Sequence, residues 1–505
     1  MEDGAIVEPD TRAALVGWLL RRGDAPEIVE THVSVLGFQG DRAYKAKKAV
    51  CFDFLDLSTS ELRAAACERE VSLNQRLAPD VYLGTVDITD ADGLVVERAV
   101  EMRRMPAARR LATLVRSGVD AGPCIDSVAE TVARFHALAE RSETISATAR
   151  RDAIADLWER GFAETRPFVG SVLDAEVADR VELLARRYLA GRDPLFESRI
   201  VSGRICDGHG DLLADDVFCL DDGPRILDCL EFDDRLPERR RAGRRRVPRH
   251  GPRATGAARP GEEVHRPLPR SHVRHLAGLA RAPLHRVSSP RSRQGRGLRH
   301  GQGDPAAADR ARVRFALAAA HLEAQRVRLV LVGGLPGTGK STLAAALAAH
   351  TGAALERSDV TRKAMAGLAA THRTGDRESE GLYAPNVTDA VYRGLLDTAR
   401  GRLAGGESVI LDASWAGAAH RRAAERIARD TASDLLQIRC EAMSDVAAAR
   451  ISLRAAEGAD PSDASVAVAT AMAQRFEPWP DAATLDTTSL SPEATLERAV
   501  GLLPP

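Results

Sequence analysis

Eight consecutive residues, GLPGTGKS at positions 334–341, have the types and spacing of a loop that binds phosphate. In the pattern G-x-x-x-x-G-K-[ST], glycines let the backbone turn its N–H groups inward, the lysine neutralises phosphate charge and the hydroxyl ligates Mg²⁺. The apolar run VRLVLVGG precedes this phosphate loop and the helical run STLAAALAAH follows it. A chance glycine loop is the alternative, but the chain has only five lysines, which makes a chance match rare. The predicted nucleotide-binding residues are Gly334, Leu335, Pro336, Gly337, Thr338, Gly339, Lys340, Ser341 and Thr342.

Three charged residues after the loop have the chemistry to complete a site for phosphoryl transfer. Lys340 would contact the β- and γ-phosphates and Ser341 the magnesium ion, with Asp412, at the end of the apolar run VILD, as a further metal ligand. Asp359 and Arg362 lie three apart in SDVTRK, on one face of a helix's first turn. Asp359 there could orient or deprotonate an acceptor hydroxyl. Each residue also has a structural interpretation, as a turn cap, a helix cap or a solvated arginine.

The elements around these residues alternate between strands and helices. Helical sequence begins near Asp304, and the strand-like run VRLVLVGG then leads into the phosphate loop. After the loop and its helix, the strand-like runs SVILDA, DLLQIRC and ATLDTT alternate with Ala/Arg-rich helices. Such alternation predicts a parallel β-sheet flanked by helices, the fold of a P-loop NTPase, over residues 304–505.

Composition limits the other possibilities. The 505 residues predict two or three domains, and 44% hydrophobic with 28% charged residues argue against global disorder. No apolar run reaches the roughly 18 residues of a membrane span, and the acidic N-terminus lacks the apolar core of a secretory signal. We therefore expect a cytoplasmic protein. Because no CxxC pair occurs, we expect neither disulfides nor structural zinc among the seven cysteines, Cys51, Cys67, Cys124, Cys206, Cys219, Cys229 and Cys440.

Residues 1–235 also mix strands and helices. The helical spacing in 59–79 has Thr59 or Ser60 as its cap and Pro79 as its stop. The residues that carry this spacing, in steps of three or four, are Leu62, Ala66, Arg69, Leu73 and Leu77. We further expect strands over 42–50, VYLGTVDI and 93–106, a helix over 130–140 and a hairpin over 217–234.

Residues 236–303 break these patterns. From Arg241 to His300 the chain has 16 arginines, no lysine and 2 glutamates, a local charge of +14, and no aromatic residue. Such a segment cannot bury enough apolar surface to offset its ordering entropy, so we expect disorder. A genuine basic linker and a stretch translated out of frame are both open as explanations. We do not expect a nucleic-acid partner, because no aromatic residues interleave for base stacking.

Residues 327–505 resemble the small P-loop kinases of the gluconate-kinase, polynucleotide-kinase and zeta-toxin type. In that family a [ST]-D-x-x-R segment handles the acceptor, and SDVTRK matches it. An arginine-bearing lid follows, which ARISLRAAEGADPSDA at 449–464 resembles. The resemblance implies that Arg450 and Arg454 neutralise the transferring phosphoryl group. An ordinary exposed helix face is the alternative interpretation.

Residues 207–234 resemble the catalytic region of aminoglycoside-phosphotransferase-like and choline-kinase-like enzymes, whose pattern is H-G-D-L-x-x-x-N followed by a hairpin and an Asp. The resemblance makes Asp211 the catalytic base and Asp228 a magnesium ligand. Asp216 occupies the asparagine position, as a departure that can still ligate Mg²⁺. An acidic loop and hairpin without catalysis is the alternative.

Upstream residues fit the same template. Lys47 matches the lysine that binds the nucleotide phosphates, with Lys45 as a second candidate. Glu70 matches the helix glutamate that pairs with it, with Glu68 as a second candidate. Residues 101–105 match the hinge against adenine, although no G-x-G-x-x-G loop precedes them.

The whole chain resembles bacterial bifunctional proteins that join an aminoglycoside-phosphotransferase-like domain to a P-loop kinase domain, many of them called AAA-family ATPases. This resemblance implies an α/β and α+β multidomain protein: a protein-kinase-like domain at 1–235 with an incomplete large lobe, the segment 236–303, and a P-loop domain at 304–505. The expected function is ATP- and Mg²⁺-dependent phosphoryl transfer by the C-terminal domain to a small hydroxyl-bearing acceptor. The alternative is an ATP-binding regulatory protein without kinase activity.

Overall fold

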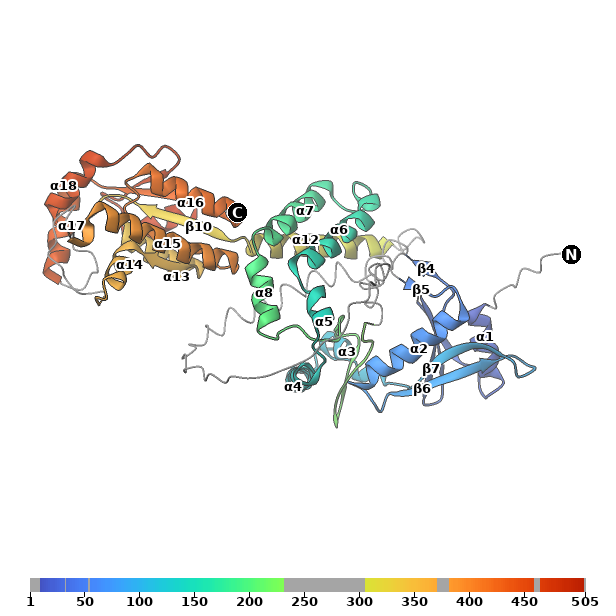
Figure 1. The fold of residues 1–505 in the computed structure, drawn as a ribbon. Helices are drawn as coiled ribbons and strands as arrows, with labels where there is room; N and C mark the ends of the chain where they lie inside the picture. Colours follow the sequence, from blue (N-terminus) through green and yellow to red (C-terminus); the bar gives the residue numbers. More distant parts are fainter. Residues whose placement is uncertain are drawn as a thin grey trace, which may run out of the picture. The chain divides into compact units, whose positions relative to one another are not determined.

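The computed structural model describes residues 10–31, 33–52, 55–230, 305–369, 381–457 and 464–503. It divides into an N-terminal unit, Met1–Thr148 with Ile205–Asp309, and a C-terminal unit, Ala149–Arg204 with Arg310–Pro505 (Figure 1). In this division residues 149–204 pack with the C-terminal half of the chain. The segment predicted to be disordered lies outside the described residues. Within the described ranges, none of the helices combines the length and apolarity that a membrane span needs.

A five-stranded parallel sheet forms the centre of the C-terminal unit. Its strand order is β11 (Ala354–Arg357), β12 (Val409–Asp412), β10 (Arg328–Gly333), β13 (Asp434–Glu441) and β14 (Ala483–Asp486), and every neighbouring pair is parallel. The predicted parallel sheet with flanking helices is therefore confirmed.

Helices cover both faces of this sheet, which explains why its central strands are apolar throughout. Leu329 and Leu331 of β10 pack toward α15 (Pro385–Ala404) and α16 (Ala418–Asp430). The alternate residues Val330 and Val332 pack toward α13 (Lys340–Thr351) and α19 (Pro492–Val500). The remaining elements after the phosphate loop are α14 (Ser358–Met365), η5 (Gly381–Tyr383), α17 (Ser444–Glu457) and α18 (Val466–Arg475).

Polar contacts attach residues 149–204 to the rest of the C-terminal unit. This segment contains α6 (Arg151–Thr165), η2 (Arg166–Phe168), α7 (Ala175–Leu189) and α8 (Asp193–Val201), and α12 (Pro305–Ala324) precedes β10. Arg187 forms an ion pair with Asp434 at the start of β13, and the buried Arg192 donates to the carbonyl of Thr431. These contacts join residues far apart in sequence, so neither composition nor periodicity could reveal them.

The first part of the N-terminal unit is built around an antiparallel sheet. Its strand order is β1 (Glu27–Glu30), β2 (Ser34–Gln39), β3 (Arg42–Lys47), β7 (Val95–Arg103) and β6 (Tyr82–Thr89). The short strands β4 (Cys51–Phe52) and β5 (Leu55–Asp56) follow β3 in the chain and form a separate two-stranded sheet. Helix α1 (Thr11–Leu20) packs on one face, with Leu15 and Trp18 against Tyr44 and Ala46 of β3. Helix α2 (Ser60–Gln75) packs on the other face, against Ala43.

Helix α2 confirms the predicted helix, but the residues that it buries are not those that carried the helical spacing. Thr59 accepts a hydrogen bond from the Leu62 N–H, as a cap should, and Leu62 itself is 39% exposed. The helix ends at Gln75, before Pro79. Ion pairing explains the discrepancy, because a polar side chain can be buried where a counter-charge meets it. The buried residues of α2 are Arg63, Cys67, Glu70, Val71 and Asn74.

The second part of the N-terminal unit packs helices against a hairpin. Strands β8 (Val217–Leu220) and β9 (Gly223–Ile226) pair antiparallel, which confirms the predicted hairpin. The helical elements here are η1 (Ala107–Arg109), α3 (Leu111–Arg116), α4 (Gly122–Leu138) and α5 (Glu143–Thr148). Val128, Val132 and Phe135 of α4 pack on the apolar cluster that includes Val217 and Ile226.

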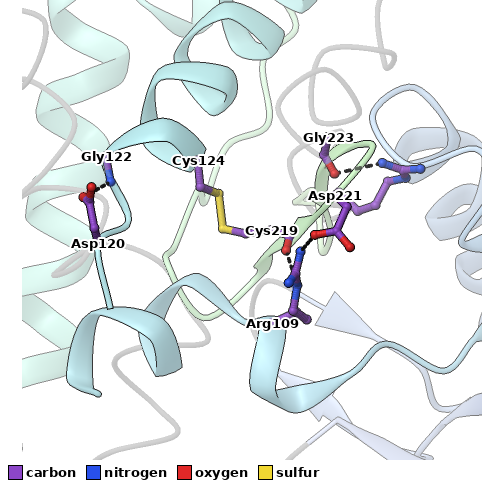
Figure 2. The surroundings of a disulfide bond; sticks show 8 residues. Arg109, Asp120, Gly122, Cys124, Cys219, Asp221 and Gly223 are labelled. Carbon is purple, nitrogen blue, oxygen red and sulfur yellow. Dashed lines mark hydrogen bonds and ion pairs between the residues drawn. A yellow bond between two sulfur atoms is a disulfide. The ribbon is translucent and has the colours of Figure 1, made fainter. Parts of the chain in front are cut away.

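A disulfide joins α4 to this hairpin, and the expectation of no disulfide is therefore wrong. Cys124 and Cys219 are bonded although 95 residues separate them in sequence (Figure 2). Figure 2 also shows Arg109 beside this bond, where its Nε donates to the carbonyl of Cys219 at 2.7 Å and its guanidinium pairs with Asp221. No local spacing signals this bond, because only the tertiary fold brings the two residues together.

We predict that reduction of this disulfide destabilises the N-terminal unit. A cross-link across a long loop restricts the unfolded chain, and removing one typically costs about 2–4 kcal/mol. Calorimetry of Cys124→Ser should show a lower unfolding temperature, insensitive to dithiothreitol, whereas Cys51→Ser, which removes an exposed free thiol, should behave like the wild type. A non-reducing peptide map without a Cys124–Cys219 cross-link would contradict the prediction.

Candidate functional site

The phosphate loop connects β10 to α13 through three glycines in backbone conformations that other residues rarely adopt. The φ angles of Gly334, Gly337 and Gly339 are 134°, 81° and 81°. A Cβ at Gly334 would collide with the carbonyl oxygen of Cys440, and one at Gly337 with that of Ala447. Both backbone conformation and close packing therefore require glycine at these positions.

The loop ends at the amino end of α13, where the helix offers N–H groups and a partial positive charge. Lys340 is the first residue of α13, and its N-cap, Gly339, supplies no side chain to cap the helix. The Thr338 hydroxyl donates to the carbonyl of Leu335 at 2.8 Å, and the Thr487 hydroxyl donates to that of Thr338 at 2.9 Å. These bonds fix the loop while the helix terminus stays available to an anion such as phosphate.

Asp412 is a buried carboxylate at the same edge of the sheet. It is the last residue of β12 and only 4% exposed. Its Oδ2 accepts a hydrogen bond from Arg357 Nε at 3.1 Å, whereas its Oδ1 is buried and has no hydrogen-bond partner among the described residues. Burial raises the pKa of the Cys440 thiol to about 12, and the charges of Lys340 and Asp412 act on it in opposite directions. Both charges are therefore within electrostatic reach of Cys440 in β13.

The donors at this edge fit a magnesium ion. Mg²⁺ prefers oxygen ligands, takes only one or two from a protein and completes its shell with phosphate oxygens and water. The Ser341 hydroxyl on α13 and the Asp412 carboxylate are such donors. Within the described ranges Oδ1 of Asp412 has no hydrogen-bond partner, and a cation would supply one. These two residues would hold the ion.

Both residues predicted to handle the acceptor belong to α14, with Asp359 in its first turn and Arg362 in its last. Arg362 is buried, and its guanidinium donates to the Leu382 carbonyl at 2.6 Å and lies 4.6 Å from the Tyr383 ring centroid. Burial raises the pKa of the Tyr392 phenol, and the negative charge of Asp359 also raises it. Arg362 thus anchors α14, and the Asp359 carboxylate lies within electrostatic reach of Tyr392.

Of the two predicted lid arginines, Arg450 contacts the phosphate loop at one carbonyl and also contacts Thr487, which itself bonds to the loop. It donates to Thr487 Oγ1 at 3.0 Å, to the Thr487 carbonyl at 2.8 Å and to the Gly337 carbonyl at 3.5 Å. These bonds fasten α17 beside the loop. Arg454 belongs to the same helix, and its side chain lies outside the described part of the structure.

Two residues at this site were missed by the sequence analysis. Arg357 directly precedes SDVTRK, and its position at the end of the strand-like run ALER was the signal that could have identified it. Thr487 follows the final strand and joins it to both the loop and Arg450. Neither residue belongs to a spacing motif, so only the ends of the strands could have indicated them.

The N-terminal unit contains a second charged cluster, between β3 and α2. The two oxygens of Glu70 each accept a hydrogen bond from a lysine at 2.5 Å, Oε1 from Lys45 and Oε2 from Lys47. Lys45 also bonds Asp228 Oδ1 at 3.1 Å. The two lysines lie on the same face of β3, because side chains two positions apart in a strand point to the same side of the sheet. The predicted pairing of Glu70 with a lysine on this strand is thus present with both candidates.

The geometry distinguishes the alternatives that the sequence left open. Lys47 has no exposed surface, whereas Lys45 is 8% exposed and lies between Glu70 and Asp228. Glu68, the second candidate for the glutamate, instead pairs with Arg98 at 2.6 Å in an exposed position. The cluster therefore consists of Lys45, Lys47, Glu70 and Asp228.

The segment that carries Asp211 runs beside the segment that carries Asp228. His209 Nε2 bonds the Leu227 carbonyl at 3.0 Å, and the Leu230 N–H donates to the His209 carbonyl at 2.9 Å. Asp228 has a φ of 66°, which is uncommon outside glycine and typical of functional sites when the fold maintains it. Asp216 is joined to the same segment, since its carbonyl accepts from the Leu227 N–H at 2.9 Å.

Asn74 of α2 supports this arrangement and was also missed by the sequence analysis. Its Nδ2 donates to the Glu70 carbonyl at 2.8 Å, and its Oδ1 accepts from the Cys229 N–H at 2.8 Å. The Tyr82 hydroxyl accepts from the Asp228 N–H at 3.3 Å. The helix and the neighbouring strand therefore fix the backbone on both sides of Asp228.

Comparison with known proteins gives matches to a domain family, to whole proteins and to solved structures. Residues 329–479 match the family described as "AAA domain". Over 489 residues the chain is 38% identical to the uncharacterized protein Rv2004c of Mycobacterium tuberculosis (strain ATCC 25618 / H37Rv), with 94% of each chain covered. The uncharacterized protein Mb2027c of Mycobacterium bovis matches to the same extent.

The solved structures are similar to about a third of the chain. A sugar kinase from Janibacter sp. HTCC2649 is 20% identical, with a TM-score of 0.28, over 35% of this chain and 94% of its own. The APS kinase CysC of Mycobacterium tuberculosis, solved with AMPPNP and APS, is 18% identical, with a TM-score of 0.26, over 35% of this chain and 97% of its own.

We predict that His209 makes the stability of the N-terminal unit depend on pH. Burial lowers the pKa of His209 below the ordinary 6.5, and it outweighs the hydrogen bond from Nε2 to the Leu227 carbonyl and the charge of Asp228, which both raise that pKa. The folded state therefore binds a proton at lower pH than the unfolded state, and stability that is complete above 6.5 decreases as the pH falls below it.

Urea denaturation above and below pH 6.5 tests this prediction with His209→Gln as the reference. Glutamine retains an N–H donor but does not titrate. The wild type should lose more stability on acidification than the variant, and equal losses would contradict the assignment.

Proposed function

Since this chain belongs to the same family as the mycobacterial protein Rv2004c, and its C-terminal domain is a P-loop kinase-like domain, we propose that it is an ATP-dependent phosphotransferase. The C-terminal domain would transfer the phosphoryl group to a small hydroxyl-bearing acceptor in the cytoplasm. The observation that carries the proposal is the pairing of the phosphate loop with the buried carboxylate of Asp412 at one edge of the parallel sheet.

Phosphoryl transfer needs positioning and charge neutralisation more than covalent chemistry from the protein. The N–H groups of the phosphate loop and of the first turn of α13 would hold the phosphates, and Lys340 would neutralise charge on the transferred group. Ser341 and Asp412 would hold Mg²⁺, which would neutralise charge on the phosphates when bound. The contacts of Arg450 with Gly337 and Thr487 support a role in fixing the loop.

Asp359 would serve the acceptor. It lies in the first turn of α14, directly after β11, at the carboxyl edge of the sheet that also carries the phosphate loop. A carboxylate there can accept the proton of a hydroxyl as that oxygen attacks the phosphoryl group. Arg362 would keep α14 in place through Leu382 and Tyr383.

A regulatory protein that binds ATP without transferring its phosphate is the alternative from another functional class. The two differ in their response to acceptors. A kinase should hydrolyse or transfer ATP faster when a mixture of sugars, sugar acids and nucleosides is added, whereas a regulatory ATPase should keep its basal rate.

The cluster around Lys45 supports a second candidate function, phosphoryl transfer or nucleotide binding by the N-terminal unit. Lys45 contacts both Glu70 and Asp228, an arrangement that could hold the nucleotide phosphates and a metal ion near Asp211. We assign the phosphate contact to Lys45, since Lys47 is fully buried. Asp228 and Asp216 would be the metal ligands and Asp211 the base for the acceptor hydroxyl.

We predict that Lys340→Ala lowers ATP turnover on the order of 10²–10³-fold, because the lysine stabilises charge that develops in the transition state. The rate should be measured side by side for the wild type, Lys340→Ala and Asp211→Ala. Lys48→Ala is the matched control, since the exposed ammonium of Lys48 pairs with Glu30 at 2.7 Å and its removal should leave the rate unchanged.

The two variants separate the two sites. A rate that collapses only in Lys340→Ala assigns turnover to the C-terminal domain. A rate that survives Lys340→Ala but falls in Asp211→Ala would refute the main proposal and favour the N-terminal unit instead.

A further inference from the structure

We propose that Arg357 positions Asp412 as the magnesium ligand of the phosphate-loop site, an inference that rests on the proposed nucleotide binding at this site. The guanidinium holds Oδ2 of the carboxylate, and Oδ1 is thereby presented to the metal. Arg357 is a positioning residue in this scheme and needs no contact with the nucleotide.

Strand pairing places the two side chains together. Strands β11 and β12 are parallel neighbours, and Arg357 is directly opposite Asp412 in their register. Both are the last residues of their strands, so both emerge at the carboxyl edge, where the phosphate loop leaves β10. The register of the parallel strands therefore brings Arg357 and Asp412 into contact.

Burial makes this contact necessary. The Asp412 side chain is 4% exposed, and an ionised carboxylate removed from water must find cationic or hydrogen-bonding partners. Arg357 satisfies Oδ2 at 3.1 Å. Oδ1 remains buried without a hydrogen-bond partner among the described residues, and a divalent cation with a preference for oxygen would satisfy it.

Arginine suits this role better than lysine. A guanidinium is planar, always charged and presents its N–H groups in fixed directions, so it fixes the orientation of a carboxylate. An ammonium group can satisfy the charge but leaves the carboxylate free to rotate. Carboxylate ligands of metals commonly depend on such supporting bonds, whose loss lowers metal affinity roughly 10–100-fold.

The experiment measures how strongly magnesium and nucleotide assist each other's binding, with the fluorescent analogue mant-ATP as the probe. The Kd of mant-ATP is determined with and without MgCl₂. The Kd without magnesium divided by the Kd with magnesium is the magnesium ratio, and it reports the coupling. In Arg357→Ala the ratio should fall roughly 10-fold or more. The Kd without magnesium should stay that of the wild type, and Arg357→Lys should give an intermediate ratio.

Arg402→Ala is the matched control. Arg402 pairs with Glu356, the neighbour of Arg357 on β11, at 2.9 Å and also with Glu407, so its removal disturbs the same strand without touching Asp412. Its magnesium ratio should equal that of the wild type. If the magnesium ratio falls equally in Arg402→Ala and Arg357→Ala, the fall comes from a less stable β11, and the inference is overturned.

The remaining outcomes are also decisive. An unchanged ratio in Arg357→Ala would overturn the inference, and an increased ratio would too, since it would mean that the guanidinium competes with the metal for Asp412. If wild type and Lys340→Ala bind mant-ATP equally weakly with MgCl₂ present, the proposed function itself fails. If the wild type binds tightly and only the Arg357 effect is missing, the proposed function stands and this inference alone fails.

Discussion

The need to neutralise buried carboxylates shapes both units of this protein. A carboxylate removed from water costs several kcal/mol unless cations and hydrogen-bond donors surround it. In the N-terminal unit, Glu70 is 1% exposed and meets two lysines, so β3 and α2 can pack only in the register that brings the three together. In the C-terminal unit, Asp412 imposes the same requirement on the ends of β11 and β12.

The two carboxylates differ in how completely the protein satisfies them. Both oxygens of Glu70 are bonded, and this completeness suits a group that holds other residues in place. Asp412 has one bonded oxygen and one without a hydrogen-bond partner among the described residues. Incomplete satisfaction of a buried charge is expected where a ligand supplies the missing partner. The contrast therefore supports a structural role for Glu70 with Lys47 and a metal-binding role for Asp412.

The sequence predicted the elements whose signals are local. The phosphate loop, the parallel sheet around it, the helix capped by Thr59 and the hairpin at β8 and β9 follow from spacing, apolar runs and turn residues, and the structure contains all of them. Contacts between distant segments carry no such signal. The Cys124–Cys219 bond, the attachment of residues 149–204 and the bond from Arg357 to Asp412 arise only when strands and helices assemble.

The buried face of α2 shows a further reason why the sequence was insufficient. Helical periodicity identifies a buried face by its apolar residues. Arg63 and Glu70 are nevertheless buried there, because Glu97 on β7 and the lysines of β3 meet them. A pattern that counts apolar residues assigns such positions to solvent, so it selected Leu62 instead.

The few lysines of this chain show where the chemistry of an ammonium group matters. The chain uses arginine for nearly all its cations and has lysine at only five positions. A compact ammonium allows two cations to bond the two oxygens of one buried carboxylate from neighbouring positions of a strand, where two guanidinium forks would be too large. Lys45 and Lys47 make this arrangement at Glu70.

Lys340 occupies the first turn of α13, where a glycine loop leaves room for a small point charge beside phosphate. A chain biased toward arginine thus has lysine at both candidate sites, and this distribution links its composition to the proposed chemistry.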